Sequence, residues 1–155
     1  MPGASMSSGS DAYHDLCCYT LAHGGAEFIH QHVVDAFGAQ EASANDRPIR
    51  LVFSLIGLYL HVERGFTGRE VQLAHMKLGQ RKQVWPVLAI PEQPGAVTAV
   101  EVCAAPLSDR DSMIHKWCHS VWQAFAAHRE VIEHLLAEHG ITDSRSVRQH
   151  TRSGK

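Results

Sequence analysis

The sequence predicts an all-α protein: a single-domain helical bundle of five main helices and one short helix, with a proline-rich extended segment around 83–97. Two observations support this fold class. Apolar residues recur at the three- and four-residue spacing of amphipathic helices through most of the chain. Residues that start or end helices stand at the borders of these periodic segments. The length of 155 residues is enough for one domain with its own core.

The first part of the chain predicts a leader and two helices. Residues 1–10 are rich in Gly and Ser, and we expect a flexible leader there. The first helix is predicted from Asp11 to Ala22, followed by the helix-ending pair Gly24–Gly25. The second helix is predicted from Ala26 to Gln40, and its core stripe consists of Ile29, Val33, Ala36 and Phe37.

Two further helices are bordered by clear signals. Pro48 suits the first turn of a third helix over 48–64, which is apolar on most sides and ends at Gly65. Thr67 and Glu70 have the spacing of a capping box, in which hydroxyl and carboxylate satisfy free backbone N–H groups. They predict a fourth helix that continues to about Arg81.

The last third of the chain begins with the proline-rich segment. Three prolines exclude a helix over 83–97, so this segment is expected to wrap the bundle in extended form. Thr98 and Glu101 form a second capping-box pattern and predict a short helix that ends at Pro106. A long last helix is predicted over 108–139. The bundle domain therefore spans 11–140, and residues 141–155 are expected to be a flexible basic tail.

Composition excludes two classes of protein. Fourteen basic and 16 acidic residues give a net charge of −2, which lacks the basic footprint of a nucleic-acid binder. No apolar run approaches membrane-spanning length, and the first ten residues lack an apolar signal core, so a cytoplasmic location is expected. The four cysteines contain no CxxC pair and are expected to be thiols rather than bridges.

Histidine is the unusual part of the composition, with 12 residues dispersed along the chain. Residues three, four and seven apart share a helix face, so each polar side chain can be assigned to a face by its neighbours. This assignment places Gln31, His32 and Asp35 away from the core, and His61, His115 and His119 as well. It places one ionisable group of each long helix on or beside an apolar face: His14, His30, Glu63, His75 and His128.

This inward set predicts a metal site. A buried carboxylate is costly unless it is protonated, paired with a cation or bound to a metal. Imidazole and carboxylate groups from separate helices commonly hold Zn, Fe or Mn in bundles. We therefore expect His30, Glu63 and His75 to bind a divalent metal, with His14 as a fourth ligand or general base. Ligand-binding residues around this metal are expected to be Tyr19, Gln40, Tyr59 and His128.

The functional hypothesis is a metal-binding helical bundle that acts on a small-molecule substrate as a metal-dependent hydrolase or lyase. The alternative is a non-enzymatic helical module that binds a small molecule or a partner protein, with structural inward histidines. Each histidine could instead be satisfied by a backbone carbonyl or water, and Glu63 could pair with Arg64, Arg69 or a histidine. A homodimer formed through an unmatched apolar helix face is a third alternative.

A series of short motifs runs through the chain: Tyr13-His14-Asp15-Leu16-Cys17, Tyr19-Thr20-Leu21, Phe28-Ile29-His30-Gln31, Val34-Asp35-Ala36, Gly57-Leu58-Tyr59-Leu60, Glu63-x-Gly65-x-Thr67-Gly68-Arg69, Gln72-x-x-His75-Met76 and Trp85-Pro86. Together these motifs resemble an uncharacterised bacterial family of small proteins that carries only a domain-of-unknown-function label. The resemblance covers about residues 12–125 and lends no activity. Relatives often begin with a Cys-Pro-x-Cys-type segment, whereas Met1–Pro2–Gly3–Ala4 has no cysteine.

Overall fold

The computed structural model describes residues 9–23, 25 and 27–153, and within these ranges it is all-α, which confirms the predicted fold class. None of the helices in these ranges is long and apolar enough to cross a membrane. The helices are α1 (Gly9–Ala22), α2 (His30–Gln40), α3 (Pro48–Arg64), α4 (Gly68–Leu78), α5 (Ala99–Ala104), α6 (Arg110–Phe125), α7 (Arg129–Glu138) and α8 (Ser144–Ser153), with 3₁₀ turns at Leu107–Asp109 and Ala126–His128.

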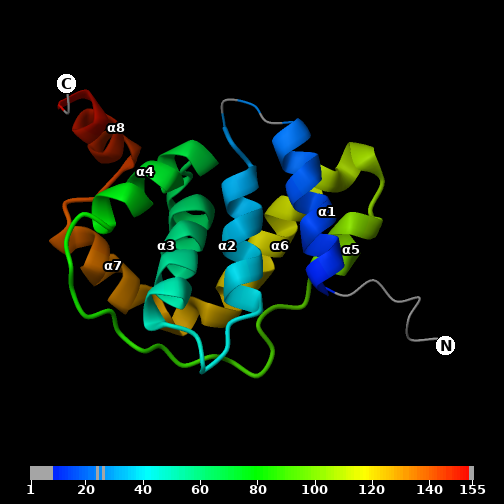
Figure 1. Ribbon diagram of the computed structural model, residues 1–155, viewed down its shortest axis with the longest axis horizontal. Coiled ribbons are helices and arrows are strands. Elements are labelled where there is room, and N and C mark those ends of the chain that lie inside the picture. Colours follow the sequence, from blue (N-terminus) through cyan, green and yellow to red (C-terminus); the bar gives the residue numbers. More distant parts are fainter. Residues whose placement is uncertain (1–8, 24, 26, 154–155) are drawn as a thin grey trace.

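The helices pack around α2, α3 and α6. In Figure 1, α1, α2 and α3 stand side by side, and α6 crosses behind α2 and α3 and packs against both. The short helix α5 packs on α1 at one end of the molecule, while α4, α7 and α8 lie at the other end. The largest fully buried side chains include Trp117 and Trp122 of α6 and Leu55 and Ile56 of α3. α3 and α6 therefore provide much of the core.

Most predicted helix borders are confirmed. Pro48 occupies the first turn of α3, and Gly65 ends that helix in the left-handed conformation with φ 71°. Both capping boxes form, at the start of α4 and at the start of α5. Their side chains satisfy backbone N–H groups that would otherwise have no partner within the helix.

Two helices are shorter than predicted. α4 ends at Leu78 rather than near Arg81. α2 begins at His30 rather than Ala26, because residues 27–29 lie against the start of α4. The Arg69 N–H donates to the Glu27 carbonyl at 3.2 Å. A Cβ at Gly68 would come within 1.8 Å of the Phe28 carbonyl oxygen, so only glycine permits this approach.

The predicted last helix is divided, so this prediction was wrong. A 3₁₀ turn at Ala126–His128 separates α6 from α7, although this sequence contains neither Gly nor Pro. The imidazole Nε2–H of His128 donates to the carbonyl of Ala89 in the proline-rich segment at 2.8 Å. The tighter turn redirects the chain, and α7 packs against α3. A tertiary contact rather than a helix-breaking residue accompanies the division.

The segment expected to be a flexible tail contains α8. This helix packs against α4, and Val147 is 1% exposed. The Arg148 guanidinium pairs with the Glu70 carboxylate at 2.8 Å. The expected leader falls mostly on residues 1–8, which lie outside the described residues, while Gly9 and Ser10 already belong to α1.

The proline-rich segment has no helix or strand and runs along one edge of the bundle (Figure 1), as predicted. The Gln40 amide donates to the carbonyls of Pro94 and Val97 at 3.1 and 2.7 Å. The Ser120 hydroxyl accepts from the backbone N–H of Ala96 and Val97. These contacts from α2 and α6 hold the extended chain against the helices.

α2 and α3 approach each other closely at two glycines. A Cβ at Gly57 of α3 would lie 1.9 Å from Oδ2 of Asp35 in α2. A Cβ at Gly38 of α2 would lie 2.5 Å from Oγ of Ser54 in α3. Each helix therefore places a polar side chain against the bare backbone of the other. This contact puts Asp35 between the two helices.

Gly57→Ala tests the close contact. Alanine normally favours a helix over glycine by about 0.5–1 kcal/mol, but here its methyl group would overlap the Asp35 carboxyl. We expect a loss of about 1–3 kcal/mol in the free energy of unfolding, as in other overpacked cores. Urea denaturation measures it. The control is Gly79→Ala, whose Cβ would be 3.4 Å from its nearest neighbour; equal stability of the two variants would refute the overlap.

Candidate functional site

α2 is covered on several sides. α1, α3, α4 and α6 all pack against it. Its only formally charged residue is Asp35, and both Asp35 and His32 are 3% exposed. The prediction that these two side chains face solvent was therefore wrong. Sorting residues around one apolar stripe assumes that a helix has one buried face, and α2 has more than one.

Burial keeps the Asp35 carboxyl in its neutral form. Loss of water raises its pKa well above the ordinary 3.8, and a hydrogen bond from the Gln31 amide to Oδ1 at 3.1 Å opposes this only in part. Oδ2 is buried against Gly57 and has no hydrogen-bond partner in the described structure. A carboxylate without a cationic partner would be strongly destabilised here, so the protonated acid is the favoured species.

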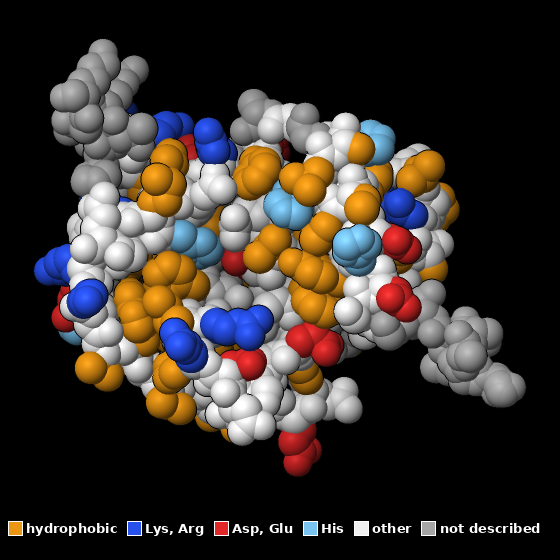
Figure 2. All heavy atoms as spheres, viewed as in Figure 1, with side chains coloured by type: hydrophobic (Ala, Val, Ile, Leu, Met, Phe, Trp, Pro, Cys, Tyr) orange, Lys and Arg blue, Asp and Glu red, His pale blue; other side chains and the backbone are white. Residues whose placement is uncertain are grey.

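Asp35 lines a pocket of about 350 Å³ between four helices, which we call the Asp35 pocket. Figure 2 shows the face that carries α2 and α3, hollowed near its centre, with hydrophobic, histidine, acidic and basic side chains around the hollow. α1 contributes one residue and α4 one, and α2 and α3 supply the rest. The lining residues are Tyr13, Gln31, Val34, Asp35, Phe37, Gly38, Arg50, Phe53, Ser54 and His75.

Aromatic rings form two walls of the Asp35 pocket. The rings of Tyr13 and Phe37 are stacked, with centroids 4.0 Å apart and planes within 6°. The Phe53 ring, also in the lining, stacks on His75 at 5.0 Å. Such flat, rigid surfaces suit a planar ligand.

His75 is the second ionisable group that burial holds neutral in this pocket. Desolvation lowers its pKa to about 4. Its Nε2–H donates to the Phe53 carbonyl at 2.8 Å, and in the neutral ring this leaves Nδ1 as a hydrogen-bond acceptor. The pocket therefore combines a neutral carboxylic acid with a neutral imidazole.

The three predicted metal ligands each have a separate partner. His30 Nδ1 lies 2.9 Å from the Thr20 hydroxyl, while His75 bonds Phe53. Glu63 is paired with the Arg129 guanidinium and also accepts from the Trp122 indole N–H. In residues 9–23, 25 and 27–153, no group of three or more His, Cys, Asp or Glu side chains is placed to hold a metal. Of the three, only His75 lines the Asp35 pocket, and metal binding by this set stays a prediction.

The remaining predicted site residues are dispersed. His14 is exposed on α1. The Tyr19 hydroxyl donates to Asp111 at 2.8 Å, at the contact of α1 with α6. Gln40 and His128 hold the proline-rich segment. None of these residues lines the Asp35 pocket.

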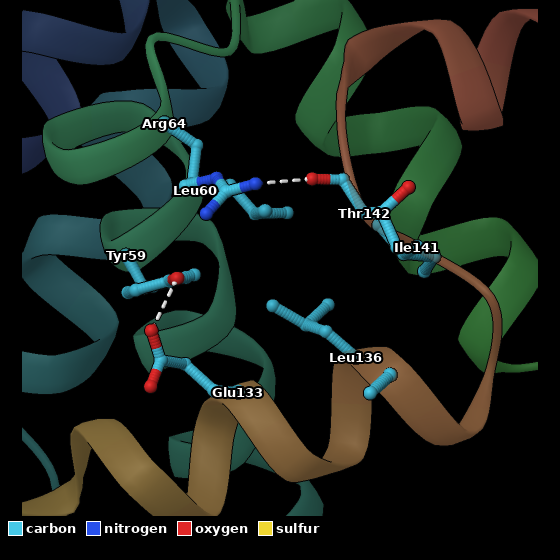
Figure 3. Close-up of a pocket in the computed structure, with 8 residues that line it drawn as sticks. Tyr59, Leu60, Arg64, Glu133, Leu136, Ile141 and Thr142 are labelled. Carbon is cyan, nitrogen blue, oxygen red and sulfur yellow. Dashed lines mark hydrogen bonds between the residues drawn. The ribbon is translucent and has the colours of Figure 1, made fainter.

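Tyr59 lines a smaller pocket of about 160 Å³ beside α7. Figure 3 shows its hydroxyl pointing to Glu133, with a hydrogen bond of 2.8 Å, and Arg64 pointing to the Thr142 carbonyl. The polar groups of this pocket thus bond to one another. Leu136 and Ile141 supply apolar wall. Because its polar groups are already paired, this pocket offers a ligand less than the Asp35 pocket does.

Sequence reasoning missed Asp35, although a signal existed. The eleven residues of α2 contain a single formal charge, which is unusual for a helix with a broad solvent face. Glycines at 38 and 57 are a second signal, since small residues allow helices to pack closely. Neither signal identifies which side chain meets which glycine.

Comparison with known proteins gives the family. A family model described as a family of unknown function (DUF5946) matches residues 6–126. The chain belongs to this family. The DUF5946 match includes every residue of the Asp35 pocket and ends before α7, so the pocket beside Tyr59 lies partly outside it. No curated protein and no solved structure matches the chain.

Asp35→Asn tests the neutral carboxyl. In the native protein Asp35 keeps its proton, whereas in the unfolded chain it releases the proton as the pH rises past 3.8. Asp35 therefore does not lower the free energy of unfolding below about pH 4, and lowers it increasingly above that pH. The amide cannot ionise, so we expect Asp35→Asn to raise the melting temperature near neutral pH. The gain should be about 2–4 °C for each kcal/mol recovered, and should vanish below about pH 4.

Thermal melts near neutral pH and below about pH 4 measure the change in melting temperature. Asp15→Asn, on the exposed side of α1, is the control. A gain for Asp35→Asn that does not depend on pH would contradict a raised carboxyl pKa.

Proposed function

We propose that this protein binds a small, uncharged, planar molecule in the Asp35 pocket. The observation that carries the proposal is that Asp35 and His75, from different helices, line one pocket and are both held neutral by burial. Ionisable groups with strongly shifted pKa values concentrate at binding and catalytic sites. A pocket of about 350 Å³ falls in the size range of small-molecule sites.

The lining chemistry favours an uncharged ligand. The one formally charged side chain in the lining besides Asp35 is Arg50, which pairs with Asp46 at 3.5 Å and is 71% exposed. The interior therefore offers neutral partners, and an ion would lose its hydration without gaining an opposite charge. A ligand without formal charge avoids this cost.

The hydrogen-bonding groups favour a ligand edge with both a donor and an acceptor. The amide of Gln31 can donate and accept, and Nδ1 of His75 can accept. The aromatic walls favour a flat ring. A heterocycle with adjacent N–H and C=O groups combines these features, and we propose this ligand class.

Three further expectations from the sequence remain proposals. They include a cytoplasmic location, a bacterial origin, and metal-dependent hydrolysis or lysis of a substrate. The Asp35 pocket favours the non-enzymatic binding alternative, because polar groups from separate helices line one hollow of small-molecule size.

Ligand-observed NMR on untagged protein tests the proposal. The probes are uncharged heterocyclic amides and their N-methylated counterparts, which have lost the donor. Val34→Trp would fill the pocket, and Val131→Trp is the matched control on the exposed part of α7. We expect wild type and Val131→Trp to bind a common probe, with at least about tenfold weaker binding by Val34→Trp, a loss of about 1.4 kcal/mol.

N-methylation should weaken binding in the same direction. Equal binding by Val34→Trp and Val131→Trp would place the ligand elsewhere, and the absence of binding by every probe would overturn the proposed ligand class.

A further inference from the structure

Three histidines from three helices meet outside the Asp35 pocket. We call His32 of α2, His61 of α3 and His115 of α6 the histidine cluster. The rings of His32 and His61 are stacked, with centroids 3.6 Å apart and planes within 19°. Nε2 of His61 lies 3.0 Å from Nδ1 of His115. None of the three lines the Asp35 pocket, so the cluster is independent of the proposed function.

His61 is held in the tautomer that a metal ligand needs. Its Nδ1 lies 3.3 Å from the carbonyl oxygen of Phe66, and since a carbonyl can only accept, Nδ1 carries the proton. Nε2 is then left with a free lone pair. Histidines that bind metals commonly donate their other ring N–H to a backbone carbonyl in this way.

The backbone that orients His61 is itself well fixed. Phe66 is 1% exposed, and its N–H donates to the Leu60 carbonyl at 2.9 Å, directly after α3 ends at Gly65. Burial lowers the pKa of His61 to about 4, so the ring is neutral near neutral pH. Metal binding requires a neutral imidazole.

We propose that Nε2 of His61 and Nδ1 of His115 together bind one divalent transition-metal ion, with water in the remaining positions. Two nitrogens that are each about 2.0–2.1 Å from an ion lie about 3 Å apart when the angle at the ion is near a right angle or slightly wider. The observed separation is 3.0 Å. Imidazole pairs suit Zn, Cu and Ni, and the exposed side of His115 leaves room for water.

The two ligands differ in mobility in a way that suits binding. His61 is packed against His32, and His32 is buried, with an Nδ1 that has no hydrogen-bond partner in the described structure. His32 therefore acts as a positioning residue that limits rotation of the His61 ring. His115 is exposed and can rotate until its lone pair and that of His61 point to the same ion. Without a metal, Nδ1–H of His115 donates to Nε2 of His61. To bind the ion, His115 takes its other neutral tautomer, with the proton on Nε2 and the lone pair on Nδ1.

This site differs from the predicted one. The predicted set of His30, Glu63 and His75 shares no residue with it. The described residues contain no group of three or more side chains placed to hold a metal, and the proposed site needs only two. His119, one helical turn after His115, is exposed and lies on the same side of α6.

Zn²⁺ titration of untagged protein by calorimetry tests the proposal, because Zn²⁺ is diamagnetic and permits NMR of the same sample. We expect one site, and ¹⁵N-imidazole spectra should show coordination shifts at Nε2 of His61 and Nδ1 of His115. His115→Ala, at an exposed position, should bind at least about tenfold more weakly, or about 1.4 kcal/mol. The control His134→Ala removes another exposed histidine, on α7, and should bind as wild type does.

His61→Gln is the second variant and should also lose the site, with circular dichroism to confirm that it remains folded. Zn²⁺ binding that survives both His115→Ala and His61→Gln would overturn the proposal. So would unchanged imidazole nitrogen shifts at saturating Zn²⁺, which would leave the pair as a hydrogen bond only.

Discussion

The close approach of α2 and α3 at Gly57 and Gly38 is the constraint on which the other features depend. Glycine at these positions lets Asp35 and Ser54 lie against the backbone of the opposing helix. The Asp35 carboxyl is thereby removed from water, and no cation pairs with it in the described structure. Since an unpaired buried charge would cost several kcal/mol, the fold favours the protonated acid.

The same packing explains why neutral ionisable groups collect around α2. With four helices against it, α2 has little surface left for solvent. Burial, together with the nearby His61 and His115 rings, lowers the pKa of His32 to about 2. Burial also holds His75 of α4 neutral. The same two effects therefore operate in the Asp35 pocket and in the histidine cluster. Desolvation sets the protonation state, and hydrogen bonds to backbone carbonyls set the imidazole tautomers.

The sequence predicted the helix ends that are determined by residues at or next to them. Pro48, Gly65 and the two capping boxes act within a few residues, and the structure confirms them. The division between α6 and α7 has no local signal, since it accompanies a bond from His128 to Ala89, 39 residues away. The start of α2 likewise depends on Gly68, which admits the Phe28 carbonyl from a distant segment.

The candidate site was harder to predict for the same reason. Glu63 has apolar neighbours along its helix, but its charge is paired by Arg129, 66 residues away. Among the predicted metal ligands, His75 does line the Asp35 pocket. Asp35 and His32 were assigned to solvent because a single stripe cannot describe a helix covered on several sides. Which faces are covered is a property of the packed bundle and cannot be read from one helix.

Site-specific ¹³C NMR of the Asp35 carboxyl as a function of pH tests the central claim most directly. The carboxyl carbon reports ionisation of this group alone, independent of stability or ligand. The account predicts that Asp35 stays protonated through the range in which an ordinary aspartate, with a pKa near 3.8, has ionised. A titration of Asp35 at that ordinary value would show that the carboxyl is hydrated, and the close contact of α2 with α3 would then be wrong.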